Sequence, residues 1–335
     1  MDTLMTLSAP GTLQSSMDGF DFQKLVSLKG RDFLTILDLT PQECQTLLGF
    51  ARQLKMLKRG RVPHRFLNGR SVAMYFEKPS NRTRVSFEVG IYDLGAHPLY
   101  LRKEEINLGV RETIADTART LSRYVDAIMI RTFAHKDVEE LAEWASVPII
   151  NGLTDDHHPC QVLADLQTIQ EHLGGFKGQK LVFAGDGCNN MSHSLMEGAA
   201  LVGMDFAVAC PPGHEPSPVV LARAQKMAEY TGSRITVTNQ MSEALKGATV
   251  VYADVWASMG QEAEAEARKA VMMPYQVNGE AMAQADPKAI VLHCLPAHRG
   301  EEITHEVLER YADVIFDEAE NRLHAQKALM AAVMA

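Results

Sequence analysis

The sequence predicts an α/β fold made of two doubly wound parallel-sheet domains. Short apolar runs alternate with helical stretches along most of the chain, which is the pattern of a parallel sheet covered by helices. A polar, turn-like stretch at 151–158 interrupts the alternation, which then starts again. The length of 335 residues also fits two domains, because a domain has roughly 100–200 residues.

The first half of the chain supplies four predicted strands. The run RSVAMYF at 70–76 is apolar and β-rich, so we expect a buried strand there. The helix predicted at 85–94 is expected to end at Gly95, because glycine is common just after a helix. The predicted strands are 70–76, 98–101, 127–131 and 147–150, and the predicted helices are 85–94, 114–124 and 138–144.

The second half opens with a long helical stretch at 160–173, ended by Gly174 and Gly175. The strands predicted after it are 180–184, 206–209, 234–238, 250–252 and 290–293. The last segment, 320–334, is an Ala- and Met-rich helix that is expected to pack back on the first domain. The predicted division is a loosely ordered tail at 1–27, a first domain of 28–150 plus 320–335, and a second domain of 151–319.

Composition narrows the class of protein. The formal net charge of -9 argues against general nucleic-acid binding, which usually needs a basic surface. No apolar run reaches the length of about 18 residues that a membrane helix needs. Residues 1–20 contain no Lys or Arg, unlike a secretory signal or a mitochondrial transit peptide. The five cysteines are odd in number and widely spread, which favours a reducing cytoplasm over a disulfide framework.

The stretch FEKPSNRTRVSFE at 76–88 is the first candidate for a binding site. It runs from a predicted strand end through a loop into a helix, and Ser80 is a good N-cap. Backbone N–H groups at a helix start attract phosphate. Arg82 and Arg84 add positive charge, and Thr83 adds a hydroxyl donor. These residues indicate an oxyanion site, although a capped surface helix with exposed arginines is equally compatible with them.

Two further segments are candidates to complete such a site. Arg131 stands at the end of an apolar strand, where an unpaired charge is uncommon. In the run HHPCQ at 157–161, His158 is suited to donate to a carbonyl oxygen and Gln161 to bind an amide-like group. A salt-bridged structural arginine and a solvated surface histidine are the competing interpretations. Only convergence of these segments in the fold would make a site.

Two strand ends in the second half are candidates for binding a second substrate. Asp254 begins the run DVWASMG after an apolar strand, where it is placed to meet a cationic amine. The residues 258–260 are typical of a loop that closes over a ligand. Cys294, in the run HCLPAHRG at 293–300, is a candidate thiol near substrate. The alternatives are an Asp that caps a surface turn and an inert buried Cys.

Dinucleotide and metal sites are disfavoured. The run GDGCNNMS at 185–192 follows a strand and opens a helix, but Asn190 takes the place of the third glycine of the dinucleotide fingerprint. Asn190 is therefore better interpreted as a ligand hydrogen-bonder or a turn residue. The histidines and cysteines at 157–160 and 293–298 match no standard zinc spacing.

Together these motifs resemble the aspartate/ornithine carbamoyltransferase family, from about residue 30 to the end. The family's Ser-x-Arg-Thr-Arg loop and the following Ser-Phe-Glu are found at 80–88, and its His-Pro-x-Gln motif at 158–161. Its His-Cys-Leu-Pro motif is found at 293–296, and the Ser-Met-Gly loop of its ornithine branch at 258–260. The resemblance implies an active site in the cleft between the two domains, and a homotrimer with active sites near subunit interfaces.

The resemblance also implies a reaction, in which the carbamoyl group of carbamoyl phosphate moves to the δ-amine of L-ornithine in arginine metabolism, more often biosynthesis. It requires no metal or organic cofactor, since carbamoyl phosphate is already activated. The residues carried over for carbamoyl phosphate are Ser80, Asn81, Arg82, Thr83, Asn107, Arg131, His158, Gln161, Cys294, Leu295 and Arg322. Those carried over for ornithine are Asn190, Asp254, Ser258 and Met259. The expected catalytic residues are Arg131, His158, Asp254 and Cys294.

The sequence departs from the family pattern at two positions. Asn81 stands where the family commonly has Thr, and Asn107 where many microbial members have Gln. Asn107 would reach the carbamoyl phosphate of a neighbouring subunit, so the second departure affects that contact. Two rival functions stay open, a putrescine carbamoyltransferase and a non-catalytic ligand-binding relative. Putrescine lacks the α-amine and carboxylate that Asn190, Asp254 and Ser258 are expected to recognise.

Overall fold

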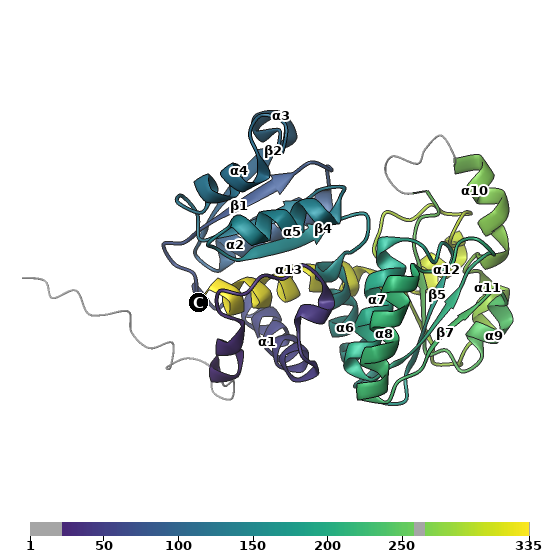
Figure 1. The fold of residues 1–335 in the computed structure, drawn as a ribbon. Coiled ribbons are helices and arrows are strands. Elements are labelled where there is room, and N and C mark those ends of the chain that lie inside the picture. Colours follow the sequence, from purple (N-terminus) through teal and green to yellow (C-terminus); the bar gives the residue numbers. More distant parts are fainter. Residues whose placement is uncertain (1–21, 258–264, 335) are drawn as a thin grey trace, which may run out of the picture.

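Two parallel β-sheets, each covered by helices, make up the computed structural model, which describes residues 22–257 and 265–334 (Figure 1). The first sheet has the strand order β2-β1-β3-β4 and the second has the order β7-β6-β5-β8-β9. In each sheet the strand that comes first in the sequence lies inside, and the chain winds outward in both directions. The predicted fold class is therefore confirmed.

Every predicted strand is present. The first sheet contains β1 (Ser71–Phe76), β2 (His97–Arg102), β3 (Ala127–Arg131) and β4 (Ile149–Leu153), and the second contains β5 (Lys180–Ala184), β6 (Asp205–Ala209), β7 (Ile235–Thr238), β8 (Val250–Ala253) and β9 (Ile290–His293). The end of β4 was predicted wrongly, because residues 151–153 were expected in a turn. The polar Asn151 continues the strand because its backbone N–H donates to Phe33 O and its side-chain amide to Leu34 O, both at 2.8 Å.

The helices cover both faces of both sheets. They are α1 (Pro41–Arg59), α2 (Asn81–Asp93), α3 (Lys103–Ile106), α4 (Ile114–Leu121), α5 (His135–Trp144), α6 (Pro159–Leu173), α7 (Asn190–Val202), α8 (Pro218–Thr231), α9 (Met241–Leu245), α10 (Ala265–Met272), α11 (Gly279–Met282), α12 (His305–Arg310) and α13 (Ala312–Met334), with short 3₁₀ turns η1 (Phe22–Leu28), η2 (Ile36–Asp38) and η4 (Met273–Tyr275). Helices α2 and α13 begin four and eight residues before the predicted starts at 85 and 320. For α2 the reason is that its first turn, at 81–84, is polar and lacks an apolar period.

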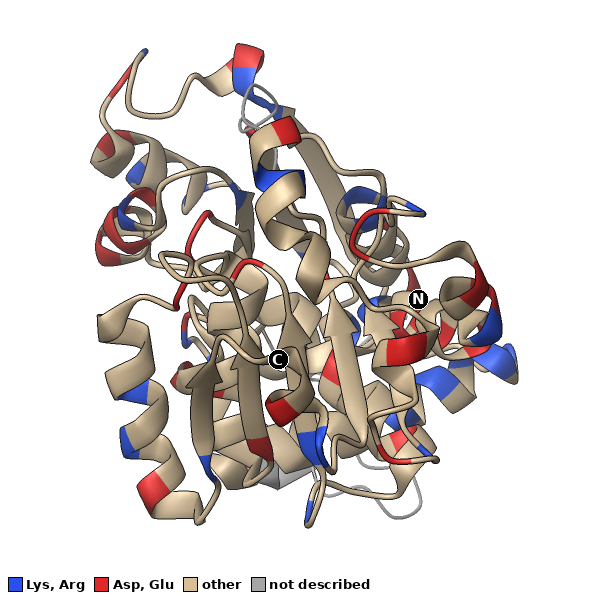
Figure 2. Ribbon diagram, turned by 90° about the vertical axis from the view of Figure 1, so that its right-hand side faces the viewer, with Lys and Arg blue, Asp and Glu red and all other residues tan. Residues whose placement is uncertain are grey.

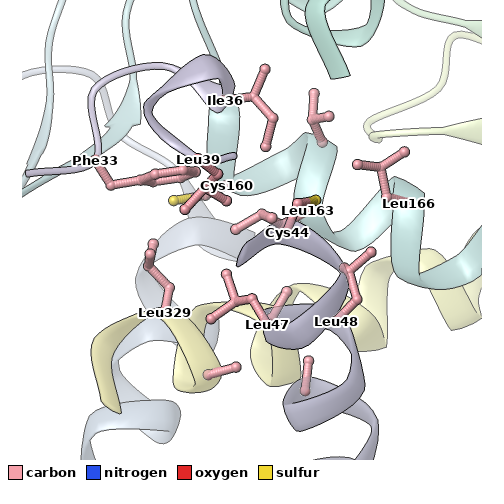
Figure 3. Close-up of a cluster of buried hydrophobic side chains, with 14 of the residues drawn as sticks. Phe33, Ile36, Leu39, Cys44, Leu47, Leu48, Cys160, Leu163, Leu166 and Leu329 are labelled. Atoms are coloured by element: carbon pink, nitrogen blue, oxygen red, sulfur yellow. The ribbon is translucent and has the colours of Figure 1, made fainter. Parts of the chain in front are cut away.

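A continuous core joins the two sheets. Alternate residues of each strand face opposite layers, so that Val72 and Met74 face the shared core, while Ala73 and Tyr75 face α4 and α5. Figure 3 shows where this shared core meets α1, α6 and α13, with Leu47, Leu163 and Leu329 pointing toward one another. Burying this apolar surface between the halves fixes how the two sheets sit against each other.

Two helices run from one half of the molecule to the other. α13 begins beside β9 and ends among α1, α2 and η1 of the first half (Figure 1), and α6 packs along it. Gly198 lets α7 approach α6 closely, because a Cβ there would lie 2.4 Å from Val162 Cγ1. The segment η1 also packs against α1, and Leu25 and Leu28 are buried, so ordered structure begins inside the predicted tail.

Most charged residues lie on the outside of the molecule. Figure 2 shows Lys, Arg, Asp and Glu mainly on helices and loops, while the strands are almost free of them. Arg131, at the end of β3, is an exception, being buried at 6% exposure. None of the described helices combines the length and the apolar character that crossing a membrane would take.

Candidate active site

The carboxyl ends of the strands from both sheets border one cleft of about 910 Å³. Open α/β sheets bind ligands at this edge. Predicted site residues that line the cleft are Ser80, Asn81, Arg82, Thr83, Arg131, His158, Asn190, Asp254, Cys294, Leu295 and Arg322. The structure thus brings together segments that are separated by more than a hundred residues in the sequence.

One wall of the cleft is the turn between β1 and α2. Ser80 is the N-cap of α2, as predicted, and its Oγ accepts from the Thr83 N–H at 3.2 Å. The helix begins at Asn81 instead of Val85, which places Arg82 and Thr83 on its first turn. The positive end of the helix dipole therefore adds to the guanidinium charge of Arg82 at this wall.

Three guanidinium groups meet at this wall. Arg131 Nη1 and Arg322 Nη2 lie 3.5 Å and 3.1 Å from Thr83 Oγ1, and Arg131 Nε is buried without a partner. Burial lowers the pKa of Arg82, and burial together with the charges of Arg322 and Arg82 lowers that of Arg131 to about 9. Three cations held this close favour an anion between them. The cluster is suited to a phosphate group.

His158 and Gln161 stand at the start of α6. His158 is buried, and its backbone N–H donates to Ser194 Oγ at 2.8 Å while its Nδ1 has no partner. Burial, with the charges of Arg322 and Arg131, holds the pKa of His158 well below its usual range, so the imidazole is neutral. Gln161 is not in the lining, and its Oε1 accepts from Arg322 Nη1 at 2.6 Å. Gln161 therefore affects the cleft indirectly, by holding the side chain of Arg322 in place.

The opposite wall carries a buried carboxyl group and a thiol. Asp254 Oδ1 accepts from the Val255 N–H at 2.8 Å and from Cys294 Sγ at 3.1 Å. Asp254 Oδ2 accepts from Asn189 Nδ2 at 3.3 Å. Burial, together with the neighbouring Asp254, raises the pKa of the Cys294 thiol well above its usual range. Cys294 is therefore a hydrogen-bond donor to Asp254 rather than a thiolate nucleophile.

A tight turn after β9 presents Leu295. Its backbone N–H donates to His293 Nδ1 at 2.9 Å, and the other ring nitrogen of His293 lies 3.0 Å from Glu302 Oε1. Since Nδ1 accepts, Nε2 carries the proton and donates to Glu302. Both His293 and Glu302 are buried, so this pair fixes the turn that follows Cys294.

Besides Gln161, one predicted site residue of the described ranges lies outside the cleft lining. Asn107 is outside the cleft lining, at the end of α3, where it adopts a left-handed backbone with φ of 50°. Ser258 and Met259 fall outside the described residues. Asn190 does line the cleft, and its Nδ2 donates to Thr154 O at 2.7 Å.

Several polar residues of the cleft were missed by sequence reasoning. Lys78 pairs with Asp155, and both line the cleft. Asp186 pairs with Arg268 at 2.6 Å, and Asn189 caps α7 besides contacting Asp254. Lys78 and Asp186 follow shortly after β1 and β5, so the rule that pointed to Asp254, a polar residue just past a strand, would also have found them.

In the described ranges, one group of side chains has ligand atoms close enough to hold a metal, namely His298, Glu301 and Glu302. Glu302 already accepts from His293, and Glu301 pairs with Lys269 at 3.2 Å. These contacts account for the two carboxyl groups without an ion.

The cleft and the two sheets define the class of protein. The model of the carbamoyl-phosphate-binding domain of aspartate/ornithine carbamoyltransferases matches residues 31–171, and the model of their Asp/Orn-binding domain matches residues 177–333. The chain belongs to the aspartate/ornithine carbamoyltransferase family.

Individual relatives narrow the comparison. An ornithine carbamoyltransferase of Thermococcus kodakarensis is 54% identical over 310 residues, which cover 92% of this chain and 98% of the relative. The anabolic ornithine carbamoyltransferase of Pyrococcus furiosus is 52% identical over the same shares of the two chains. A solved ornithine carbamoyltransferase structure from P. furiosus superposes with a TM-score of 0.89 at 52% identity, covering 92% of this chain and 98% of that chain. The structure of an anabolic ornithine carbamoyltransferase from Campylobacter jejuni superposes with a TM-score of 0.85 at 39% identity, covering 90% of this chain and 97% of that chain.

Proposed function

We propose that this protein transfers the carbamoyl group of carbamoyl phosphate to the δ-amine of L-ornithine, giving L-citrulline and phosphate, in the biosynthetic direction of arginine metabolism. The observation that carries the proposal is one cleft with three clustered guanidinium groups on one wall, and on the other the buried Asp254 hydrogen-bonded to Cys294. Relatives more than 50% identical bear the name of this activity, and one of them is called anabolic.

Carbamoyl phosphate would bind at the wall made by α2, β3 and α13. The phosphate is held by the first-turn N–H groups and side chains of Ser80, Asn81, Arg82 and Thr83, together with Arg131. Arg322 binds it from α13, with Gln161 holding Arg322 in place. His158 and the backbone beyond Cys294, including Leu295, face the carbamoyl group. Arg131, His158 and Thr83 stabilise the oxyanion that forms at the carbonyl.

Ornithine would bind at the other wall. The Asp254 carboxylate receives the cationic α-amine, and Asn190 hydrogen-bonds the amino-acid end. Ser258 and Met259 close over the substrate. Asp254 and Cys294 together orient the chain so that its δ-amine points to the carbamoyl carbon. The carboxylate and the thiol thus serve binding and alignment, without a covalent intermediate.

The chemistry is a direct acyl transfer. The δ-nitrogen forms a bond to the carbamoyl carbon, and the C–O bond to phosphate breaks, with the electron pair and the amine proton leaving on phosphate. A lysine-like amine has a pKa near 10.4, so removing its proton at pH 7 costs about 5 kcal/mol. A cleft rich in cations lowers this cost, because positive neighbours disfavour the ammonium form.

Phosphate release with separate amine acceptors tests the proposal. Ornithine should support fast turnover, while putrescine, aspartate and N-acetylornithine should not. Turnover with putrescine at a similar kcat/KM would favour the putrescine alternative. A protein that is protected by carbamoyl phosphate in a thermal melt but releases no phosphate with any amine would be the non-catalytic relative.

We further propose a cytoplasmic homotrimer, with domains divided at 28–150 plus 320–335 and at 151–319. The five cysteines are all unpaired, which suits a reducing compartment. Asn107 lies outside its own cleft, at the edge of the first sheet beyond β2, where it is free to reach a neighbour's cleft. Light scattering should give a mass three times the 37.0 kDa of one chain.

A further inference from the structure

A second layer of polar groups lies directly behind the cleft. Asp165 on α6 and Glu318 on α13 are 0% and 1% exposed, and neither lines the cleft. Gln161 Nε2 donates to both, at 2.8 Å to Asp165 Oδ1 and at 3.0 Å to Glu318 Oε1. Two carboxyl groups therefore share one amide in the protein interior. Two ionised carboxylates so placed repel each other and lack hydration, so one of them must hold a proton.

The donors around the pair decide which carboxyl group is ionised. Glu318 Oε1 also accepts from the Tyr252 hydroxyl at 3.2 Å, and Glu318 Oε2 accepts from the His293 N–H at 2.8 Å. Three donors thus point at Glu318. Asp165 receives only the amide of Gln161, and its Oδ2 is buried without a partner. A negative charge is stabilised where donors converge and is costly where they are missing.

The electrostatic surroundings agree with this assignment. Burial raises the pKa of Asp165 well above its usual range, and the neighbouring Glu318 raises it further. Burial raises the pKa of Glu318 as well, but its hydrogen bonds oppose the rise, first that with Asp165 and then that from the His293 backbone.

We propose that the pair holds a single proton, on Asp165, and that the ionised Glu318 is a positioning residue for both walls of the cleft. On the first wall, Glu318 attracts the nitrogen of the Gln161 amide, which turns Gln161 Oε1 toward Arg322 Nη1 at 2.6 Å. On the second wall, Glu318 anchors the backbone of His293, the residue before Cys294. One buried carboxylate thereby sets the alignment of a phosphate-binding arginine and of the thiol beside the ornithine site.

This inference rests on the proposed function only for its kinetic readout. The infrared difference spectrum between the unaltered protein and Asp165→Asn tests the proton directly. We expect the variant to lose the C=O stretch of a protonated, buried carboxyl group. The matched control is Glu320→Gln, two residues from Glu318 on α13, whose carboxylate instead pairs with Arg59 and His324. A spectrum in which Asp165→Asn removes only carboxylate bands would overturn the proton assignment, whatever reaction the protein catalyses.

Kinetics test the positioning role. In Glu318→Gln the new amide must direct an N–H at an existing donor, so KM for both substrates should rise about tenfold or more. Asp165→Asn has the shape of a protonated carboxyl and should change either KM by less than about threefold. The positioning role is refuted if Glu318→Gln behaves like Glu320→Gln, or if Asp165→Asn costs as much as Glu318→Gln. Should Glu318→Gln fail to fold, the spectrum of Asp165→Asn still tests the proton, and a rise of more than about threefold in either KM of Asp165→Asn refutes the positioning role.

Discussion

Replacing Arg131 by methionine should stabilise the protein while abolishing its phosphate binding. Arg131 is 6% exposed, its Nε has no partner, and its charge adjoins those of Arg322 and Arg82. These surroundings lower its pKa to about 9. At about 1.4 kcal/mol per pKa unit, keeping Arg131 charged before an anion binds costs on the order of 5 kcal/mol. Methionine fills much of the same volume without that cost.

The assay is a thermal melt with and without inorganic phosphate. Arg131→Met should melt a few degrees higher than the unaltered protein in the absence of phosphate. The unaltered protein should gain stability from phosphate, by about 2.7 kcal/mol at a hundred times Kd, and the variant should gain almost none. The pKa of Arg131 is lower in the folded than in the unfolded chain. The buried charge of Arg131 therefore destabilises the folded protein fully below pH 9, and this destabilisation is relieved as pH rises through 9. The phosphate effect should therefore fade above pH 9.

Arg84→Met is the matched control, because Arg84 lies on α2 next to Thr83, which Arg131 contacts, but pairs with Glu88 and stacks on Tyr100 away from the cleft. It should leave the phosphate effect intact. A variant Arg131→Met that melts lower than the unaltered protein and keeps its phosphate effect would refute the reasoning, since Arg131 would then be a structural residue outside the anion site.

Three other results follow from the site. Asp254→Asn should raise KM for ornithine about tenfold or more, because the cationic α-amine of ornithine loses its carboxylate partner in a buried site. The variant should keep its protection by phosphate in a thermal melt. Equal losses of ornithine binding and of phosphate protection would contradict two separate walls. Iodoacetamide should label the exposed Cys188 well before Cys294, because Cys294 is less exposed and the pKa of its thiol is raised well above the usual range; peptide mapping that finds Cys294 labelled first would be inconsistent with this. Burial lowers the pKa of His157 to about 3, so below about pH 6.5 the imidazole takes a proton in the unfolded chain but not in the folded one. The free energy of unfolding therefore falls as pH drops below about 6.5, by about 2 kcal/mol at pH 5. His157→Phe should lose less stability than the unaltered protein between pH 7 and pH 5, and melts showing equal losses would argue against a buried neutral His157.

The sequence was most informative where burial leaves a strong pattern. The β3 and β5 strands are apolar along nearly their whole length, so their ends were predictable, and with them the places of Arg131 and the loop before Asn190. The start of α2 could not be predicted, because Arg82 and Thr83 belong to a polar first turn that is fixed by the Ser80 cap rather than by apolar periodicity. Helix starts of this kind are set by tertiary contacts and capping.

The layer behind the cleft could not be predicted from the sequence. Asp165 and Glu318 are acidic residues within helices, a pattern that usually indicates a solvated face. Their burial depends on α6 and α13 packing together between the two sheets, which is a contact between segments about 150 residues apart. The placement of Gln161 behind Arg322, instead of in the lining, has the same cause.

The most direct test of the central claim follows the carbamoyl carbon itself. Carbamoyl phosphate labelled with ¹³C would be mixed with ornithine and the protein, and the label followed by NMR alongside phosphate release. The account predicts that the label moves to the ureido carbon of citrulline in step with phosphate. Phosphate release with the label in bicarbonate, or on a carbamoylated cysteine of the protein, would contradict direct transfer between the two walls of the cleft.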